Sequence, residues 1–559
     1  MGNGVSWAAV SRRPMPHQPL KLYHLPPERI QAQHAAWPNQ TLSGLLAERG
    51  AQAPTAVAIQ DGPDRAVTRA EFVHLVERLA AGLRRRGVAA GDVVAYQLPT
   101  SLDAVLLHYA VTWLGAVASP ISLLHREHDL RYMLGLVRPT LLVARPEYRG
   151  HSYAAMLRQV AAELGLEGEV LAVAPGDLTR LLADEGPLAP AEVDPNTPLY
   201  IVWTSGTTGE PKGVVHTHNT GLCGLDRKLR RIRVGEGDAM LVMVPIAHHI
   251  GIYAMHMLAL AGVRLVLMES WNADAGVELI ERTRVTFTSG PPTFLVDLLR
   301  SEALGRHDVS SLRLFSCGGA PVPASVVELA RERLPRCHTV ASYGTSEEGY
   351  VTCVSPDDPP ELSAVSDGHP LDDMEVRILG TDGRDLPPGE EGDLVVRTPS
   401  CFAAYAHRPD TTREAFLPEG DWRWTGDRAV LRTDGTVRIT GRSKDIIIRG
   451  GINLPVVQIE SALLKHPGVG SVAVVAMPDD RLGEKACAFV APNPAYSGPL
   501  SLDDLRATLR QQAIAPVYWP ERLELLKSLP MTASGKVQKF RLREVIAATL
   551  QAEQARVPR

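Results

Sequence analysis

The chain has 559 residues, more than one hydrophobic core usually organises, so at least two domains are expected. Apolar residues make up 45% and charged residues 22%, which is ordinary globular usage and argues against disordered, collagen-like and coiled-coil classes. The net charge is -5 and no basic block stands out, so we do not expect a nucleic acid as partner.

The cysteines and the N-terminus set the expected compartment. The 6 cysteines show no CxxC spacing, so neither a zinc site nor a disulfide scaffold is expected. The N-terminal MGNGVS fits a myristoylation pattern, but nothing else in the sequence indicates a membrane. The most hydrophobic tract, residues 241–268, is interrupted by proline, histidine and arginine. We therefore expect a cytoplasmic protein with reduced thiols and no membrane segment.

Helices and strands are expected to alternate through the first part of the chain. "VTRAEFVHLVERLAAGLRRRGV" has apolar residues at helical spacing behind a Thr68/Glu71 capping box. A buried strand follows in "GDVVAYQLP", then a helix over 103–113, then strands in "PTLLVA" and "GEVLAVA". This alternation predicts an α/β fold: a large N-terminal region of βαβ layers with mainly parallel sheets.

The pattern changes after residue 441. We expect a strand near residue 446, a helix over 455–465, strands in "GSVAVVAM" and "KACAFVAP", and a capped helix in "SLDDLRATLRQQ". This succession predicts a small C-terminal α+β domain. The expected parts are an N-terminal extension (1–40), a large domain (41–444) and the small domain (445–559).

The segment "YIVWTSGTTGEPKGVVHTH", residues 200–218, runs from a strand into a turn rich in glycine and hydroxyl groups. Such a turn suits an anion, because converging N–H groups bind phosphate oxygens, so the expected ligand is a polyphosphate. The Walker pattern fails: Gly209 is separated from Lys212 by two residues, and Gly213 follows the lysine. On this segment alone, a solvated loop stays an alternative.

The same segment resembles the phosphate-loop signature of the adenylate-forming superfamily, which includes acyl- and aryl-CoA ligases, peptide-synthetase adenylation domains and luciferases. Further motifs in the family's order extend the resemblance over roughly residues 40–545: "CGGAPVP" (317–323), "SYGTSEEG" (342–349), "WTGD" (424–427), "GRSKDIIIRGG" (441–451) and "LPMTASGKVQKFRLRE" (529–544). Within the superfamily the chain looks closest to cyclohexanecarboxylate-type and medium-chain acid-CoA ligases.

The resemblance implies that a carboxylic acid reacts with ATP and Mg²⁺ to give acyl-AMP, which a thiol such as coenzyme A then displaces. The implied catalytic residues are Lys536, Glu347 and His248, with Glu347 binding the metal and neighbouring Glu348 as its competitor. The implied phosphate contacts are Thr204, Ser205, Gly206, Thr207, Thr208, Gly209 and Lys212.

Nucleotide recognition is implied by the remaining motifs. Tyr343 would stack on adenine and Asp427 would accept hydrogen bonds from the ribose hydroxyls. Arg442 would contact ribose or phosphate, with a surface or interdomain ion pair as the alternative. The other implied contacts to the nucleotide are Gly318, Gly319, Ala320, Gly344, Thr345 and Ser346.

The large domain is expected to bind ATP and the acid, and the mobile small domain to deliver Lys536 and then open a thiol channel by domain alternation. Lys444 matches the family's hinge, and Arg449, Gly450 and Gly451 would lie along the channel. The chain departs from its relatives at Ile452, where an acidic residue is usual, which puts the thioester step in doubt.

His248 matches a histidine that gates the carboxylate site. Ala247 and Ile250 stand where many relatives carry aromatic rings, and Ser289 and Gly290 add a wall of small residues, so we expect a bulky hydrophobic acid that is alicyclic, aromatic or polycyclic. Three functions stay open: an acid-CoA ligase; a stand-alone adenylating enzyme of natural-product biosynthesis that passes acyl-AMP to a partner ligase or carrier protein; and an inactive nucleotide-binding scaffold. The oligomeric state stays open, a homodimer included.

Overall fold

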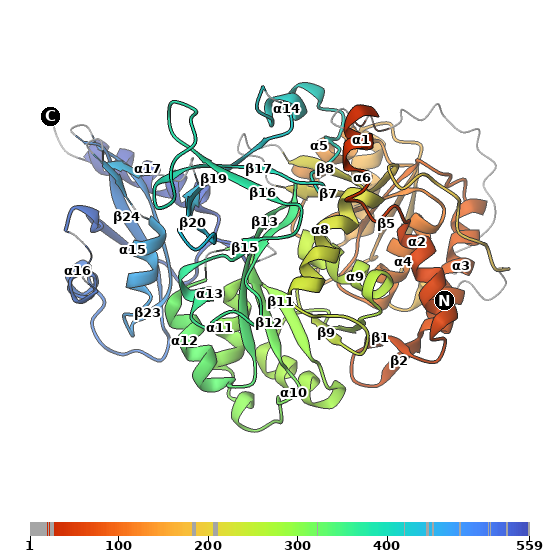
Figure 1. Cartoon of the computed structure of the whole chain (residues 1–559), viewed down its shortest axis with the longest axis horizontal. Helices are drawn as coiled ribbons and strands as arrows, with labels where there is room; N and C mark the ends of the chain where they lie inside the picture. Colours follow the sequence, from red (N-terminus) through yellow and green to blue (C-terminus); the bar gives the residue numbers. More distant parts are fainter. Residues whose placement is uncertain are drawn as a thin grey trace.

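The structure is a computed structural model of the chain. It describes residues 20, 22, 27–180, 186–204, 211–320, 322–418, 420–442, 447–449, 452–454, 456–479, 482–512, 514, 516–532 and 535–556. The fold is mixed α/β with a large N-terminal region and a smaller C-terminal domain, which confirms the predicted fold class (Figure 1).

The first sheet of the large region has nine strands in the order β15-β14-β13-β12-β11-β9-β10-β1-β2. Its central strands are parallel, while β2, β14 and β15 pair antiparallel at the two edges. The bounds are β1 Val57–Asp61, β2 Arg65–Thr68, β9 Ala239–Val242, β10 Arg264–Leu267, β11 Phe287–Gly290, β12 Leu314–Gly318, β13 His338–Thr345, β14 Gly349–Cys353 and β15 His369–Pro370.

The second sheet has seven strands in the order β18-β8-β7-β4-β3-β5-β6. Strands β4, β3, β5 and β6 are parallel to one another and to β7, while β8 pairs antiparallel with β7 and β18. The bounds are β3 Val93–Gln97, β4 Val117–Pro120, β5 Leu141–Ala144, β6 Glu169–Ala172, β7 Pro198–Thr204, β8 Lys212–Thr217 and β18 Ala404–Tyr405.

Helices cover the faces of these sheets, and α8 (His218–Arg231) packs against β14 of the first sheet and against β7 and β8 of the second (Figure 1). α9 (His249–Ala261) packs beside α8, and both contribute to the main hydrophobic core. The other helices are α1 Pro27–Gln33, α2 Leu42–Gln52, α3 Arg69–Arg85, α4 Leu102–Trp113, α5 Glu127–Val137, α6 Tyr153–Glu163, α7 Asp177–Arg180, α10 Ala273–Thr283, α11 Pro292–Arg300, η1 Ala303–Gly305, α12 Ala324–Arg333, α13 Leu362–Val365 and α14 Pro409–Glu414.

The predicted helix start at Thr68 is confirmed. The Glu71 N–H donates to the Thr68 hydroxyl, and the Thr68 N–H donates to the Glu71 carboxylate at 2.8 Å. These reciprocal bonds satisfy two N–H groups that the first turn of α3 leaves without helical partners.

A third sheet was not predicted. It has four strands, all antiparallel, in the order β16-β17-β19-β20. The strands are β16 Glu375–Leu379, β17 Glu391–Arg397, β19 Arg423–Leu431 and β20 Val437–Arg442. This sheet lies between the large parallel layers and the C-terminal domain in the sequence, and it carries two of the predicted nucleotide contacts.

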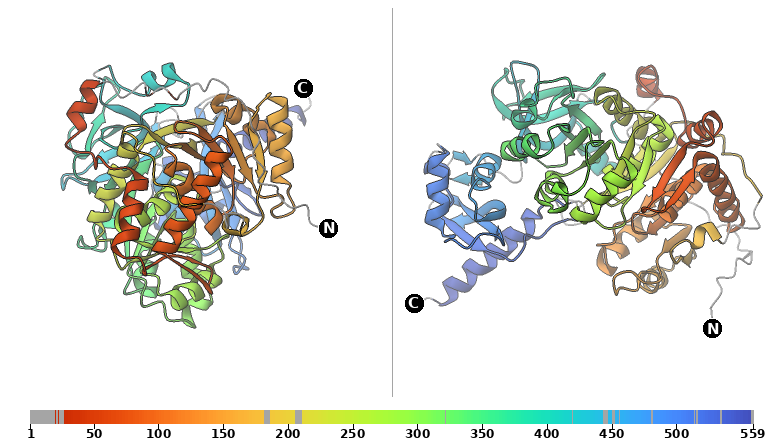
Figure 2. Two further views of the ribbon diagram at one scale, coloured as in Figure 1. Left: turned by 90° about the vertical axis from the view of Figure 1, so that its right-hand side faces the viewer. Right: turned by 90° about the horizontal axis from the view of Figure 1, so that it is seen from below.

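The C-terminal domain has a sheet of five strands and its own hydrophobic clusters, and Figure 2 shows it at one end of the molecule. The predicted elements are present, whereas the long helix α17 was not predicted. The elements are β21 Ile447–Arg449, β22 Ile452–Leu454, α15 Val456–Leu463, β23 Val469–Asp479, β24 Gly483–Pro492, α16 Leu502–Gln511, η2 Pro516–Tyr518, β25 Arg522–Leu525 and α17 Lys539–Arg556. The exact domain boundary stays a prediction, because residues 443–446 are not described.

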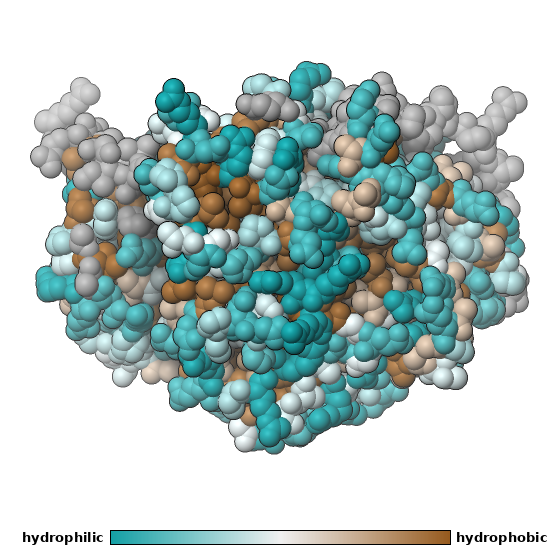
Figure 3. Space-filling model, viewed as in Figure 1, coloured by the Kyte–Doolittle hydropathy of each residue, from teal (hydrophilic) through white to brown (hydrophobic). Residues whose placement is uncertain are grey.

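Figure 3 shows hydrophilic side chains over much of one face, with hydrophobic side chains gathered in patches between them. In the described ranges, none of the helices combines the length and the apolar character needed to cross a membrane. All 6 cysteines are free and buried.

Candidate active site

Lys536 lies against the turn that follows β12. A Cβ added at Gly319 would lie 3.0 Å from Lys536 Cε and 3.4 Å from its Nζ, so any side chain at that position would press on the lysine. The N–H of Lys536 donates to the Thr532 hydroxyl at 3.0 Å, and its carbonyl accepts from the Thr532 N–H at 2.7 Å. Gly535 completes this turn with φ 78°, a conformation that favours glycine. The turn therefore fixes the backbone that presents Lys536.

The surroundings of Lys536 change its protonation. Burial disfavours the ammonium form, Arg442 adds a repulsive charge, and together they lower the pKa of Lys536 to about 8. The carboxylates of Asp427 and Glu347 act in the opposite direction. At neutral pH the lysine thus carries a positive charge that is easily lost. The structure brings Lys536 together with other predicted site residues: Gly319, Arg442, Asp427, Glu347 and His248.

Asp427 contacts two other residues that were predicted to bind the nucleotide, Arg442 and Tyr343. Strands β19 and β20 place Asp427 directly opposite Arg442, and Arg442 Nε lies 3.2 Å from Asp427 Oδ1. The hydroxyl of Tyr343 donates to Asp427 Oδ2 at 2.7 Å. Arg442 therefore forms an ion pair, the alternative considered for it, and its partner is the residue predicted to bind ribose. Tyr343, Asp427 and Arg442 form one connected polar cluster.

The two adjacent carboxylates after β13 have different partners. Glu348 is fully buried and pairs with Arg423, whose Nη2 lies 2.8 Å from Glu348 Oε2. Glu347 is half-buried and accepts from the Tyr405 hydroxyl at 2.7 Å and from the Thr345 hydroxyl at 3.1 Å. Burial alone would raise the pKa of Glu347, but Arg423 and these hydrogen bonds lower it below its ordinary value. Glu348 is thus committed to Arg423, whereas Glu347, whose lowered pKa favours the ionised form, has no ion pair among the described residues.

Strands β7 and β8 bring the two ends of the hydroxyl-rich segment together. Thr204 lies directly opposite Lys212 in the antiparallel pair. Lys212 Nζ lies 4.8 Å from the ring centroid of Tyr405, the tyrosine that binds Glu347, so this segment ends beside the carboxylate. The remaining predicted phosphate contacts lie outside the described residues: Ser205, Gly206, Thr207, Thr208 and Gly209.

His248 is the N-cap of α9, and its Nδ1 accepts from the Ile250 N–H at 3.4 Å. Burial, with the nearby charge of Lys536, lowers the pKa of His248 to about 3. The imidazole is therefore neutral at physiological pH. It can orient a carboxylate group by hydrogen bonding, but it cannot supply a positive charge.

Two of the predicted glycines have a packing reason. A Cβ at Gly344 would overlap the carbonyl oxygen of Gly349 across the β13–β14 pair. A Cβ at Gly318 would lie 2.9 Å from the Ser342 hydroxyl oxygen on the neighbouring strand. Ala320 follows Gly318 and Gly319 at the end of β12. These small residues let three strands of the site approach closely.

The residues predicted to line a thiol channel are only partly described. Arg449 lies in β21, and its Nε lies 2.6 Å from Glu521 Oε1, so both partners belong to the C-terminal domain. Ile452 begins β22. The other three predictions for this function, Lys444, Gly450 and Gly451, lie outside the described residues.

Sequence reasoning missed Tyr405 and His216. Tyr405 lies 58 positions from Glu347 and belongs to no recognised motif, so no sequence signal marked it. His216 Nε2 donates to the carbonyl of Ser346 at 2.8 Å and thereby connects β8 to the turn that carries Glu347. His216 is part of the quoted phosphate segment, but only its position on β8 reveals this contact.

The residues near Glu347 fit a magnesium ion that is also bound by phosphates and water. Within the part of the chain that is described, no group of three or more His, Cys, Asp or Glu side chains could hold a metal. Mg²⁺ is commonly bound by one or two protein carboxylates, with phosphates and water completing the shell. An ionised Glu347 near the paired residues Thr204 and Lys212 fits that pattern. The described residues alone do not build a complete metal site, so phosphates and water would have to complete it.

Known proteins resemble the chain along nearly its whole length. The family model described as AMP-binding enzyme matches residues 46–406, and the model for the AMP-binding enzyme C-terminal domain matches residues 458–536. The medium-chain fatty-acid–CoA ligase of Escherichia coli is 31% identical over 527 residues, or 93% of this chain and 92% of the relative. The salicyl-AMP ligase / salicyl-S-ArCP synthetase of Mycobacterium tuberculosis is 30% identical over 555 residues, or 95% and 96%.

A solved structure shares the fold. ATP-bound MatB from Rhodopseudomonas palustris matches with a TM-score of 0.81 and 27% identity, over 90% of this chain and 98% of MatB. The family matches cover both the parallel sheets and the domain that carries Lys536. The chain therefore belongs to the AMP-binding enzyme family, and it is an ATP-dependent, adenylate-forming acid ligase.

Proposed function

We propose that the enzyme activates a bulky hydrophobic carboxylic acid, alicyclic, aromatic or polycyclic, and transfers its acyl group to coenzyme A. The observation that carries the proposal is the position of Lys536, which lies beside Gly319 and within electrostatic reach of Asp427 and Glu347. A positive charge delivered from the C-terminal domain to this cluster suits a reaction in which negative charge grows on a phosphate.

In the first half-reaction, an oxygen of the substrate carboxylate attacks the α-phosphorus of ATP, and the bond from that phosphorus to the oxygen bridging to the β-phosphate breaks. The products are acyl-AMP and pyrophosphate. Lys536 and Lys212 neutralise the developing charge, while Asp427 binds the ribose hydroxyls. Glu347 would hold Mg²⁺ together with the phosphates, and the bound ion would add positive charge there.

In the second half-reaction, the sulfur of coenzyme A attacks the acyl carbon and AMP leaves. Rotation of the small domain about Lys444 would withdraw Lys536 and bring Arg449, Gly450 and Gly451 to the thiol. The proposed bulky acid follows from the small residues at Ala247 and Ser289. A site with less side-chain volume in its wall leaves more room for the acid.

A second candidate is an enzyme that passes acyl-AMP to a carrier protein or a partner ligase. Apolar Ile452 in place of the usual acidic residue favours it, because this position directly follows the segment proposed for the thiol channel. The salicyl-AMP ligase named above is a relative that carries a carrier-protein activity in its name. Coenzyme A-dependent release of AMP separates the two candidates.

The first test is ATP–pyrophosphate exchange with a panel of carboxylic acids, followed by AMP release with and without coenzyme A. Lys536→Ala should reduce exchange by about a hundredfold or more, because a charge that stabilises the transition state is lost. Thiolysis of supplied acyl-AMP should continue. Lys465→Ala, on the exposed end of the turn after α15, serves as the control and should retain both activities. An equal loss of both half-reactions in Lys536→Ala would contradict the assigned role.

A further inference from the structure

Lys228 is a lysine on the buried face of α8. The residue is 1% exposed, and Leu225, one turn earlier, and the adjacent Leu229 belong to the main hydrophobic core. Among the described residues, Nζ has no hydrogen-bond partner. Nζ lies 3.4 Å from the ring centroid of Tyr350, so a cation–π contact is the favourable interaction that the ammonium group makes.

A buried ammonium group without an acceptor destabilises a protein, because the ring of an aromatic residue replaces only part of its lost hydration. The hydroxyl of Tyr350 is also buried and has no hydrogen-bond partner in the described part of the chain. Two buried donors therefore flank the Tyr350 ring, Lys228 Nζ over its face and the tyrosine hydroxyl at its edge, and neither has an acceptor among the described residues. A ligand that carries two accepting oxygens, such as a carboxylate, would satisfy one donor with each.

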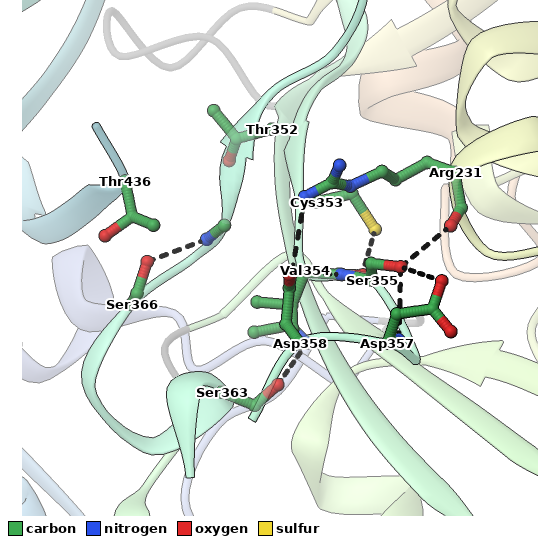
Figure 4. Close-up of polar contacts among 12 residues, drawn as sticks. Arg231, Thr352, Cys353, Val354, Ser355, Asp357, Asp358, Ser363, Ser366 and Thr436 are labelled. Carbon is green, nitrogen blue, oxygen red and sulfur yellow. Dashed lines mark hydrogen bonds and ion pairs between the residues drawn. The ribbon is translucent and has the colours of Figure 1, made fainter. Parts of the chain in front are cut away.

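The C-terminal end of α8 is hydrogen-bonded to the residues that follow β14, the strand that contains Tyr350. Figure 4 shows Arg231, one turn after Lys228, beside the residues that follow β14. Arg231 Nη2 donates to Asp358 Oδ2 at 3.3 Å, and the Ser355 hydroxyl donates to the Arg231 carbonyl at 3.4 Å. These contacts fix the register of α8 against β14, so Lys228 is held facing Tyr350.

A row of aromatic rings leads from the candidate active site to Lys228. The ring of His249, next to His248, lies 4.2 Å from the Tyr253 ring, and the Tyr253 ring lies 5.3 Å from the Tyr350 ring, centroid to centroid. Lys228 stands at the far end of this row. The near end adjoins the histidine predicted to face the reacting carboxylate.

The position of Lys228 relative to β12 agrees with this path. Burial raises the pKa of the Cys317 thiol, and the nearby charge of Lys228 acts against that rise. Cys317 directly precedes Gly318 and Gly319, where Lys536 lies. Lys228 is therefore near β12, whose end carries Gly318 and Gly319.

We propose that Lys228 and Tyr350 form the inner end of the acid site and bind an anionic oxygen that the acid carries remote from its reacting carboxylate. The inference rests on the proposed function, because it names a feature of that acid. A second carboxylate offers one oxygen to each donor, and an ionised ring hydroxyl accepts from Lys228; a charge-assisted hydrogen bond of this kind is strong in a buried site. The substrate is thus a bulky acid whose hydrophobic body ends in an anionic group.

The test compares acids of equal size and different end groups. Terephthalate, p-hydroxybenzoate and p-toluate, and naphthoic acids bearing the same three groups, are assayed by ATP–pyrophosphate exchange. The wild type should favour the carboxylate or hydroxyl form over the methyl form by about tenfold to a hundredfold in kcat/KM. Lys228→Met should lose this preference, whereas Lys228→Arg should keep part of it.

A stability measurement distinguishes substrate binding from a structural role. Because Lys228 Nζ has no acceptor among the residues that the structure describes, Lys228→Met should raise the Tm of the full chain by about 2 °C or more. Lys539→Met is the matched control: Lys539 Nζ lies 2.7 Å from Glu460 Oε1, so its removal leaves a carboxylate unpaired and should lower the Tm.

The outcomes are distinguishable. A lower Tm or misfolding of Lys228→Met, or an unchanged ratio between the paired acids, would overturn the inference while leaving the proposed function intact. Absence of exchange with every acid would instead overturn the proposed function, and the inference with it. Loss of the end-group preference together with a higher Tm supports both.

Discussion

The ammonium group of Lys536 should lose its proton just above neutral pH. Burial and the charge of Arg442 lower the pKa of Lys536 to about 8. The protonated form is the one that neutralises charge during adenylation, so kcat/KM for exchange should fall about tenfold per pH unit above that pKa. Lys536→Arg, whose guanidinium keeps its proton, should hold its residual activity to higher pH.

The measurement is the pH profile of exchange for both enzymes at one ionic strength. A falling limb at the same pH in wild type and Lys536→Arg would assign the titration to another group. The neutral His248 is not that group, because burial and Lys536 lower its pKa to about 3.

The choice between two neighbouring carboxylates could not be predicted from the sequence. The motif left two adjacent carboxylates as candidates for the metal, Glu347 and Glu348. The structure distinguishes them through Arg423, which lies 75 positions from Glu348 and pairs with it. A contact of that separation depends on how β19 packs against the β13–β14 turn, and no local pattern reveals it.

At the scale of elements, the β13–β14 pair depends on Gly344. A Cβ at this position would overlap the Gly349 carbonyl, and backbone atoms cannot move aside as a flexible side chain can. Gly344→Ala should therefore lower the free energy of unfolding by about 1–3 kcal/mol. It should also reduce exchange, because the turn that carries Glu347 must shift. Urea unfolding and exchange assays measure the two effects.

Gly305→Ala is the matched control for that substitution. A Cβ at Gly305 would meet nothing within 4 Å, so both the free energy of unfolding and the exchange rate should stay near the wild-type values. Equal behaviour of the two variants would show that the strand pair tolerates a side chain at Gly344.

Elements defined by local chemistry were predictable. The capping boxes at Thr68 and Ser501 fix the starts of α3 and α16 through residues three positions apart. The four-stranded antiparallel sheet was missed, because its strands are recognised by their pairing across long connections rather than by a regular alternation with helices. Helix α17 was missed because exposed Phe540 and Val545 obscure the apolar face that Leu542, Ile546 and Leu550 form.

At the scale of the whole molecule, the order of the motifs correctly predicted the family but not the geometry between its parts. Lys536 was expected on a flexible turn, and its position beside Gly319 results from the docking of the C-terminal domain on the large one. The same holds for Lys228, a lysine that the sequence places in a helix without distinguishing it from a solvated residue. Its burial follows from α8 lying between two sheets.

The interior of the large domain contains histidines that must stay neutral, and this should make the enzyme acid-sensitive. Burial lowers the pKa of His108 to about 3 and that of His216 to about 4, from an ordinary value of 6.5. His108 Nδ1 lies 2.9 Å from the Tyr96 hydroxyl, and its Nε2 lies 2.9 Å from His256 Nε2. In the unfolded chain these histidines bind protons as the pH falls below 6.5. In the folded chain they stay neutral until the pH approaches their lowered pKa.

The contribution of each histidine to stability is therefore complete above pH about 6.5 and is lost as the pH falls toward the folded-state pKa. At pH 5 the loss should be about 2 kcal/mol per histidine, measured by urea unfolding at a series of pH values. His108→Gln removes one titrating group and keeps a hydrogen-bonding side chain, so its stability should fall less steeply with acid. His74→Gln, on the exposed face of α3, should leave the slope unchanged. Parallel curves for wild type and His108→Gln would mean that this histidine is protonated in the folded enzyme, and that the Tyr96–His108–His256 contacts form with a charged ring.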